Sequence, residues 1–182
     1  MKILFYTLVA SAVLLIGCND SDSTSEFTEE QKNEISNLVN SQNPGTKQAK
    51  DLYSDVMANV TPVLAQMDSL TNLLRGGSTS DIVARTGTGL SVIVAKSAYL
   101  KTLSVSSDVN HGDSLIAKAI DLNNSVSNIC MYLSVNQHLL KTKSLDPDKL
   151  SSLLNAHFDA HDELVKYQHT FAEANKFKIT AK

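Results

Sequence analysis

The sequence predicts an all-α fold: an antiparallel bundle of about four long helices plus a short N-terminal helix, preceded by a cleaved signal peptide. Apolar residues recur three and four positions apart over most of the chain, which is the spacing of helices that bury one face. Capping residues, Gly and Pro separate these stretches. The chain has 182 residues, 42% of them apolar, enough for one self-sufficient core and too few for a large multidomain enzyme.

The N-terminal residues predict an export signal. Lys2 supplies a positive charge, and a mainly apolar run of fourteen residues extends from Ile3 to Ile16. This is the length of a signal-peptide core, whereas crossing the roughly 30 Å hydrocarbon layer takes about 20 apolar residues. We therefore expect residues 1–17 to be a signal peptide that is removed.

The apolar run ends in Leu15-Ile16-Gly17-Cys18, and these four residues resemble the lipobox of the bacterial lipoprotein class at every position. The resemblance implies cleavage after Gly17, a diacylglyceryl thioether on Cys18 and acylation of its freed amine. Two or three acyl chains hold a protein on a bilayer essentially permanently, since each buried methylene contributes about 0.8 kcal/mol. The lipid of the membrane is thus the first expected partner.

The residues after Cys18 bear on which membrane holds the anchor. In Gram-negative members of the class, an Asp directly after the lipidated Cys favours retention in the inner membrane. Asn19 occupies that position here, and Asp20 follows one place later. We expect the outer membrane, facing the periplasm, with the inner membrane as the alternative.

The mature chain starts with a polar segment. Residues 18–27 are predicted to form a flexible tether, because Asn19–Glu26 offers only hydroxyl, acidic and amide side chains. Residues 28–182 form the predicted bundle domain. Lys2 is the only charged residue among the first seventeen, so the remaining 165 residues carry 15 basic and 19 acidic side chains, a net charge of −4. This balance argues against a nucleic-acid partner.

The first predicted helix is short. It begins at the capping box Thr28-Glu29-Glu30-Gln31 and carries a thin apolar stripe of Ile35, Leu38 and Val39. Asn43-Pro44-Gly45 ends it.

The second helical stretch runs from Ala49 to Leu74 and ends at Gly76-Gly77. Pro62 lies inside it. A Pro at this place either kinks one continuous helix or occupies the first position of a new helix capped by Thr61. Both interpretations stay open.

The third stretch is predicted as a helix from a Ser80-Asp81 cap to about Leu103. Its apolar residues run most of the way round a helical wheel, which indicates burial on more than one side or a surface for a partner. Three small residues lie four apart and would let another backbone approach closely: Gly87, Ser91 and Ala95. The β-branched run Val92-Ile93-Val94 and the flexible Gly87-Thr88-Gly89 keep a strand or an interrupted helix open as alternatives.

The last two stretches have the most regular spacing. After the Asn110-His111-Gly112 turn, an apolar seam alternates steps of four and three: Leu115, Ala119, Leu122, Val126, Ile129, Leu133, Asn136 and Leu140. Asp146-Pro147 then predicts an N-cap with Pro at the first helical position. The same rhythm continues at Leu150, Leu154, His157, His161, Leu164, Gln168 and Phe171. Such seams are typical of helices packed lengthwise in a bundle.

One pair of residues is a candidate metal site. His157 and His161 lie one turn apart, a spacing that can present two imidazoles to a metal ion. Further ligands would come from another helix, with His138 or a carboxylate as candidates. The pair has a faint likeness to the His-rich helices of hemerythrin-type diiron bundles, but the chain lacks their further His and Glu pairs. We favour the interpretation that both are half-buried bundle positions.

No catalytic residue and no cofactor is predicted. The sequence has no Gly-x-Ser-x-Gly elbow and no phosphate loop, and Val92 stands where the dinucleotide motif needs its third Gly. Cys130 is the only thiol left once Cys18 is acylated. We expect it to be a small buried residue, with an intermolecular disulfide as the alternative.

These observations favour a non-enzymatic role. The leading hypothesis is a membrane-anchored, periplasm-facing lipoprotein that binds another envelope protein as an adaptor. Two alternatives are an immunity or exclusion lipoprotein that blocks a toxin, phage or plasmid, and a metal-binding bundle built on His157 and His161.

Overall fold

The computed structural model describes residues 44–179, all of which belong to the compact unit Ser36–Lys182. The predicted signal peptide, Cys18, the tether and the first short helix lie outside the described residues. Residues 44–179 form five helices and no strand. They are α3 (Pro44–Gly76), α4 (Thr79–Leu100), α5 (Gly112–Val135), α6 (Gln137–Lys141) and α7 (Pro147–Ala174). Four of these helices are long, so the predicted all-α bundle is confirmed for this part of the chain.

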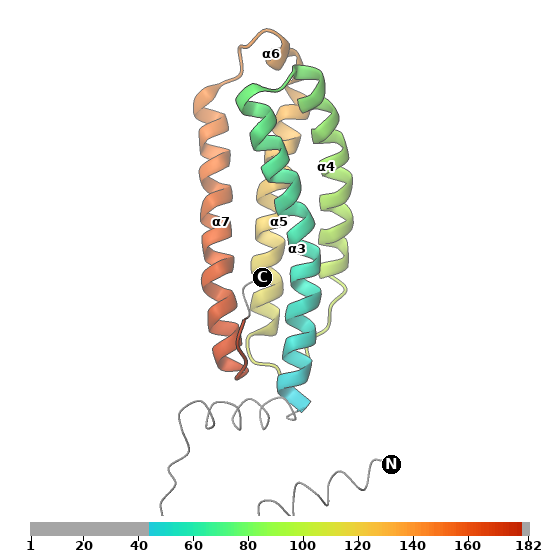
Figure 1. Ribbon diagram of the computed structural model, residues 1–182, viewed down its shortest axis with the longest axis vertical. Helices are drawn as coiled ribbons and strands as arrows, with labels where there is room; N and C mark the ends of the chain where they lie inside the picture. The colour runs from blue at the N-terminus through green and yellow to red at the C-terminus, as the bar shows by residue number, and fades with distance from the viewer. Residues whose placement is uncertain (1–43, 180–182) are drawn as a thin grey trace, which may run out of the picture. The chain divides into compact units, whose positions relative to one another are not determined.

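The four long helices lie side by side and alternate in direction, with α3 and α5 running one way and α4 and α7 the other (Figure 1). α5 is the central helix, because it packs against α3, α4 and α7. α4 also packs against α3, and the short α6 contacts α4 and α5 at one end of the bundle. No helix within residues 44–179 is both long and apolar enough to cross a membrane.

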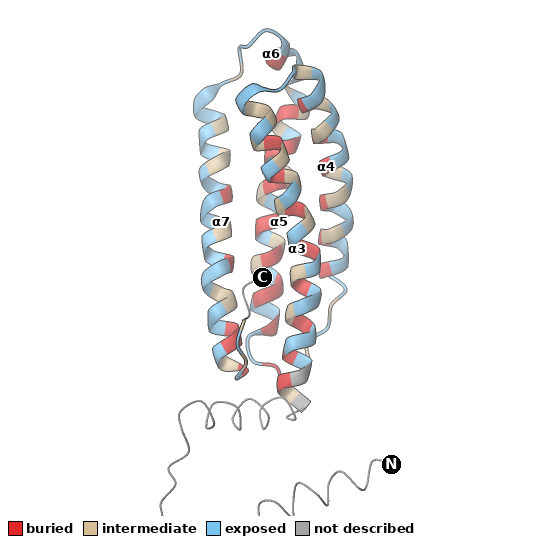
Figure 2. Cartoon of the chain, in the orientation of Figure 1, coloured by how far each residue is buried: buried red, intermediate tan, exposed pale blue. Residues whose placement is uncertain are grey.

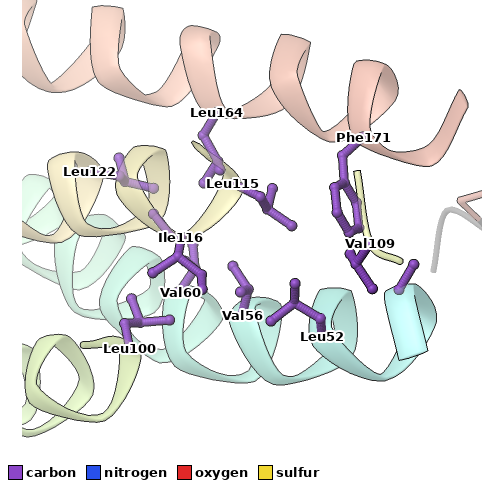
Figure 3. Packing of buried hydrophobic residues seen from close by; sticks show 12 residues of the cluster. Leu52, Val56, Val60, Leu100, Val109, Leu115, Ile116, Leu122, Leu164 and Phe171 are labelled. Carbon is purple, nitrogen blue, oxygen red and sulfur yellow. The ribbon is translucent and has the colours of Figure 1, made fainter. Parts of the chain in front are cut away.

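Apolar side chains fill the interior in two clusters. One cluster surrounds Phe171 and joins residues of α3, α5 and α7 with Leu100 at the end of α4 (Figure 3). The other lies nearer to α6 and includes Val63, Ile93 and Ile129. The buried residues of α4 and α7 lie on the sides that turn toward α5 (Figure 2). Because full burial of a Leu, Ile or Phe contributes about 1.5–3 kcal/mol, these clusters are the main stabilising contribution.

The predicted seam of α5 is confirmed from Leu115 to Leu133, where each seam residue is fully buried. Leu140 is also buried, as the seam predicts, but the prediction of one helix through Asn136 is wrong, because α5 ends at Val135 and the chain restarts as α6. The Asn136 side chain donates a hydrogen bond of 2.8 Å to the carbonyl of Tyr132, which the backbone N–H of Asn136 also uses. A side chain that competes for helix carbonyls in this way favours a helix end.

α3 settles the alternative that Pro62 left open, because the helix is continuous across it. Pro62 has no N–H to donate to the carbonyl of Ala58, four residues earlier. Ala58 is an exposed residue, so this carbonyl lies on the solvent side of the helix. A helix can pass through Pro where the freed carbonyl is open to solvent.

The predicted N-cap is wrong for α4 and correct for α7. α4 is one continuous helix from Thr79 to Leu100, neither a strand nor interrupted, and its N-cap is Ser78, whose Oγ accepts from the Asp81 N–H at 3.2 Å. The expected Ser80-Asp81 cap and the expected end near Leu103 are therefore wrong. The prediction for α7 is confirmed, since the Asp146 side chain, directly before Pro147, accepts from the backbone N–H groups of Asp148 and Lys149.

Candidate functional site

His157 lies inside the bundle with its side chain fixed by α5. The residue is only 5% exposed, and its Nδ1 is 3.1 Å from Oγ of Ser125. The Ser125 hydroxyl donates to the carbonyl of Leu122 at 2.7 Å. Because a hydroxyl has one hydrogen to donate, we assign Nδ1 of His157 as the donor to Ser125. The lone pair of the neutral ring then lies on Nε2.

The electrostatic surroundings keep His157 neutral. Burial lowers the pKa of its imidazole, and the nearby His161 lowers it further. Asp68 on α3 acts in the opposite direction, because a carboxylate favours the charged imidazolium. The net result is a pKa below the usual value of about 6.5.

His161 lies in a different environment from His157. Its side chain is 41% exposed, and Nδ1 is 3.5 Å from a carboxylate oxygen of Asp162. His138, the predicted third ligand, is exposed in α6 at the end of the bundle. Within residues 44–179, no group of three or more His, Cys, Asp and Glu side chains is arranged to hold a metal ion. Metal binding by the His157 and His161 pair was the less favoured interpretation, and it stays an untested alternative.

A cavity of about 430 Å³ lies between α3 and α7, next to His157. The exposed ring of Phe158 borders it, with its centroid 5.7 Å from that of His157. The remaining lining comes from α3: Met67, Asp68, Thr71, Asn72 and Arg75. The spacing of the sequence placed His157 on the inner face of its helix, but it gave no signal for Ser125 or for the α3 residues opposite.

Cys130 is buried, as predicted, with 2% of its surface exposed. Burial raises the pKa of its thiol to about 11, so the thiol is protonated at neutral pH. It faces α4, where a Cβ added to Gly89 would lie 3.5 Å from Sγ. A Cβ at position 89 would thus make an ordinary van der Waals contact with this sulfur.

The outward side of α4 differs from that of the other long helices. Its exposed residues between positions 84 and 99 include no charged side chain. We call this surface the α4 face, and it consists of Ala84, Gly87, Thr88, Ser91, Val94, Ala95, Ala98 and Tyr99. The charged residues of this stretch, Arg85 and Lys96, are only partly exposed, and Arg85 turns toward α3 to donate to Gln66.

Two hydroxyl side chains of the α4 face, those of Thr88 and Ser91, are hydrogen-bonded to their own helix. Thr88 Oγ1 donates to the backbone carbonyls of Ala84 and Arg85, and Ser91 Oγ donates to that of Gly87. The face therefore presents mainly carbon to solvent, with Val94 63% exposed and Tyr99 46% exposed.

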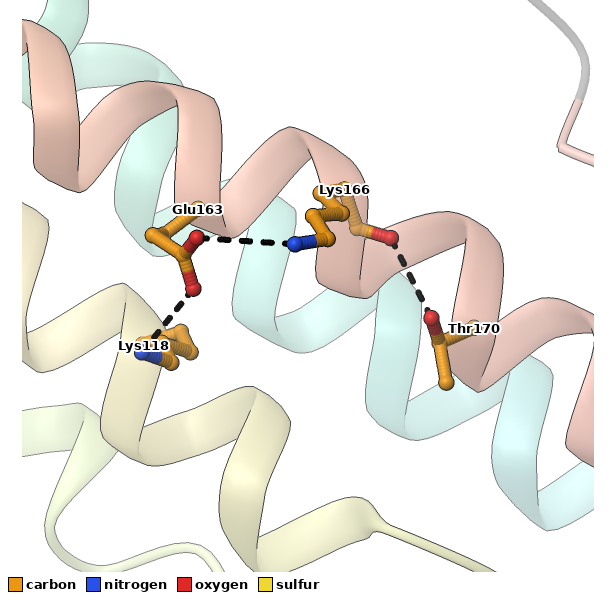
Figure 4. A network of polar contacts seen from close by, with 4 residues as sticks. All are labelled: Lys118, Glu163, Lys166 and Thr170. Atoms are coloured by element: carbon orange, nitrogen blue, oxygen red, sulfur yellow. Dashed lines mark hydrogen bonds and ion pairs between the residues drawn. The ribbon is translucent and has the colours of Figure 1, made fainter.

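Two of the other long helices, α3 and α7, expose charged side chains along their outward sides, and α3 exposes Asp55 and Asp68 among others. On α7, Glu163 pairs with Lys118 of α5 at 3.4 Å and with Lys166 at 3.8 Å (Figure 4).

α5 exposes Asp113 and Asp121 in its first half, whereas its second half exposes no charge and presents Met131, 53% exposed, and Val135, 73% exposed. Within residues 44–179, the α4 face is thus a long uncharged outward side, and the second half of α5 is a shorter one.

Comparison with family models, curated proteins and solved structures finds no match to this chain. The sequence motif at Cys18 and the surface of the bundle are therefore the observations that bear on function.

Proposed function

We propose that this protein is a lipid-anchored, periplasm-facing lipoprotein that binds a protein partner through the α4 face and has no catalytic role of its own. The observation that carries this proposal is the uncharged outward side of α4, with Val94 63% exposed, on a bundle whose helices α3 and α7 expose charge along their outward sides. Exposed apolar patches of this kind are typical of protein interaction sites.

Burying the α4 face against a partner costs little desolvation. Taking a charged or unpaired polar group out of water is expensive, but this face has no exposed charge and the hydroxyls of Thr88 and Ser91 are bonded to their own helix. Each Å² of apolar surface removed from water contributes about 25 cal/mol. Val94 and Tyr99 supply most of that surface, so a partner gains by covering them.

The distribution of residues in α4 supports the same proposal. Its inner side buries Ile82, Ile93 and Leu100 against the bundle, while apolar residues also cover the outer side. A helix that is apolar on both sides is typical of one packed on both sides. Nothing within residues 44–179 covers the outer side, and a partner protein would pack against it.

The lipobox supports the anchoring part of the proposal. Acylation of Cys18 would fix the mature N-terminus in the bilayer, and the tether of residues 18–27 would keep the bundle close to the membrane surface. A partner would thus be met at that surface, with the periplasmic face of the outer membrane favoured by Asn19. Replacing Cys18 with Ser tests the anchor, because the variant should move from the membrane to the soluble fraction.

A matched pair of substitutions tests the binding surface. Ser91→Arg places a charge in the middle of the α4 face, and Asn124→Arg places the same charge on an exposed site of α5. Both sites are exposed, so unfolding free energies should change by no more than about 0.5 kcal/mol. We expect in-cell crosslinking of the anchored protein to lose its partner species with Ser91→Arg and to keep it with Asn124→Arg. Equal crosslinking of both variants and the parent would contradict the proposal.

A further inference from the structure

The cavity of about 430 Å³ beside His157 lies in a groove between α3 and α7. Each of these helices packs closely against α5, whereas they pack little against each other. Nearer the start of α3, side chains bridge the groove, because Gln168 of α7 accepts from Tyr53 Oη and donates to Met57 Sδ. The cavity lies beyond this bridge, and its volume is within the range of pockets that hold small ligands.

Two side chains of opposite charge line the cavity from α3. Asp68 and Arg75 are both exposed, and they lie seven residues apart, which is about 10 Å along the helix axis. Neither of them belongs to an ion pair within residues 44–179. The cavity therefore offers one negative and one positive group, at a spacing set by the helix.

His157 adds a hydrogen-bond acceptor beside Asp68. Its Nδ1 is 3.1 Å from Ser125 Oγ and donates to it, so the lone pair of the ring is on Nε2. No residue within 44–179 donates to Nε2, although the side chain is 5% exposed. Both Nε2 and the Asp68 carboxylate accept hydrogen bonds, and a ligand ammonium group has three to donate.

We infer that this cavity binds a small zwitterion, with its ammonium group held by Asp68 and Nε2 of His157 and its carboxylate held by Arg75. The two charges of the ligand must lie about 10 Å apart to match the spacing on α3. Because an extended peptide spans about 3.3–3.6 Å per residue, a peptide of about three residues with free ends has this separation. A single amino acid is too short. The site is separate from the α4 face and goes beyond the proposed function.

The remaining lining suits the same ligand. Asn72 lies one turn before Arg75, and its amide can donate to the same carboxylate. The exposed ring of Phe158 borders the cavity next to His157, and the face of an aromatic ring attracts an ammonium group. These contacts recognise the two ends of a peptide, so binding should depend little on its side chains.

Calorimetric titration of the full-length protein, solubilised in detergent, tests the site with trialanine as the probe. Trialanine should bind. N-acetyl-trialanine and trialanine amide each lack one charge and should bind at least about tenfold more weakly, because charge-assisted hydrogen bonds are lost. Alanine carries both charges close together and should also bind at least about tenfold more weakly.

Two substitutions assign each charge to its residue. Asp68→Asn should weaken trialanine binding at least about tenfold and no longer discriminate against the acetylated peptide. Arg75→Gln should have the same effect for the amide. Asp55→Asn removes an exposed carboxylate of α3 outside the cavity and should bind trialanine as the parent does. All three sites are exposed, so each variant should keep the fold.

Three results would overturn the inference. The first is no binding of trialanine at millimolar concentration, and the second is equal binding of trialanine and either blocked peptide. The third is unchanged binding in Asp68→Asn or in Arg75→Gln.

Discussion

α4 and α7 both pack against α5, but they place their polar residues in opposite ways. α7 exposes charged residues such as Glu163 and Lys166, and its buried polar residue, His157, is hydrogen-bonded to Ser125. α4 exposes an uncharged face, and on its inner side the buried Ser97 Oγ has no hydrogen-bond partner among the described residues. The difference indicates that α7 separates one core from water, whereas α4 is suited to lie between two protein surfaces.

The largest effect is expected in the core of α7. Phe171 is fully buried and its ring centroid is 5.9 Å from that of Phe177, which packs back onto the bundle. Phe171→Ala removes these contacts and leaves a cavity, so it should lower the unfolding free energy by about 3–5 kcal/mol. Phe158→Ala is the control on the same helix, since Phe158 is 58% exposed and its loss should change stability by no more than about 0.5 kcal/mol. Urea unfolding of both variants checks this, and equal losses would contradict the burial described for α7.

A change of opposite sign is expected on the side of α5 that meets α4. Asn123 is fully buried, and neither its side-chain oxygen nor its nitrogen has a partner within residues 44–179. It lies two turns before Cys130 on the side of α5 that meets Gly89 of α4. A buried unpaired polar group costs about 1–3 kcal/mol, so Asn123→Leu should raise the unfolding free energy by about that amount. A loss of stability in urea unfolding would show that Asn123 is hydrogen-bonded in solution.

The parts of this comparison that the sequence predicted are local ones. The regular seam from Leu115 to Leu133 and the Asp146-Pro147 cap depend on residues close together in the chain, and both are confirmed. The α4 cap was misplaced because Ser78, Thr79 and Ser80 are all capping residues. The choice among them follows from where α3 ends, at the bond of 2.6 Å from the Gly77 N–H to the Leu73 carbonyl.

The candidate sites show the same limit. The sequence predicted that His157 lies on the inner face of its helix and that apolar residues surround most of α4. Both predictions were possible because each depends on the residues of one helix. Ser125 lies 32 residues from His157, so no local pattern could pair them. The same holds for Asp68 of α3, which lines the same cavity as His157 and raises the pKa of its imidazole.

The buried polar contact of α7 makes stability depend on pH. Because burial lowers the pKa of His157, the unfolded chain binds more protons than the folded one between the two pKa values. The stability that depends on a neutral His157 is fully present above the pKa of the unfolded chain, about 6.5. It is lost as pH falls from there through the lower pKa of the folded protein. Urea unfolding from about pH 7.5 to about pH 5.5 should show decreasing stability. His157→Gln should flatten this slope, and the exposed His169→Gln should not; an unchanged slope in His157→Gln would contradict the assignment.

The smallest effect on stability is expected from a substitution on the outer side of α7. It tests how the outer side of α7 differs from the α4 face. Glu163 and Lys118 are 52% and 34% exposed, and exposed ion pairs contribute only about 0.2–1 kcal/mol. Glu163→Gln should therefore change the unfolding free energy by no more than about 0.5 kcal/mol, as should Ser91→Arg on α4. The two outer faces then differ in association and not in stability, because a charge at Ser91 blocks the surface that we propose a partner covers. If Glu163→Gln reduces crosslinking on membranes as strongly as Ser91→Arg does, the docking surface includes α7 and the comparison between the two helices fails.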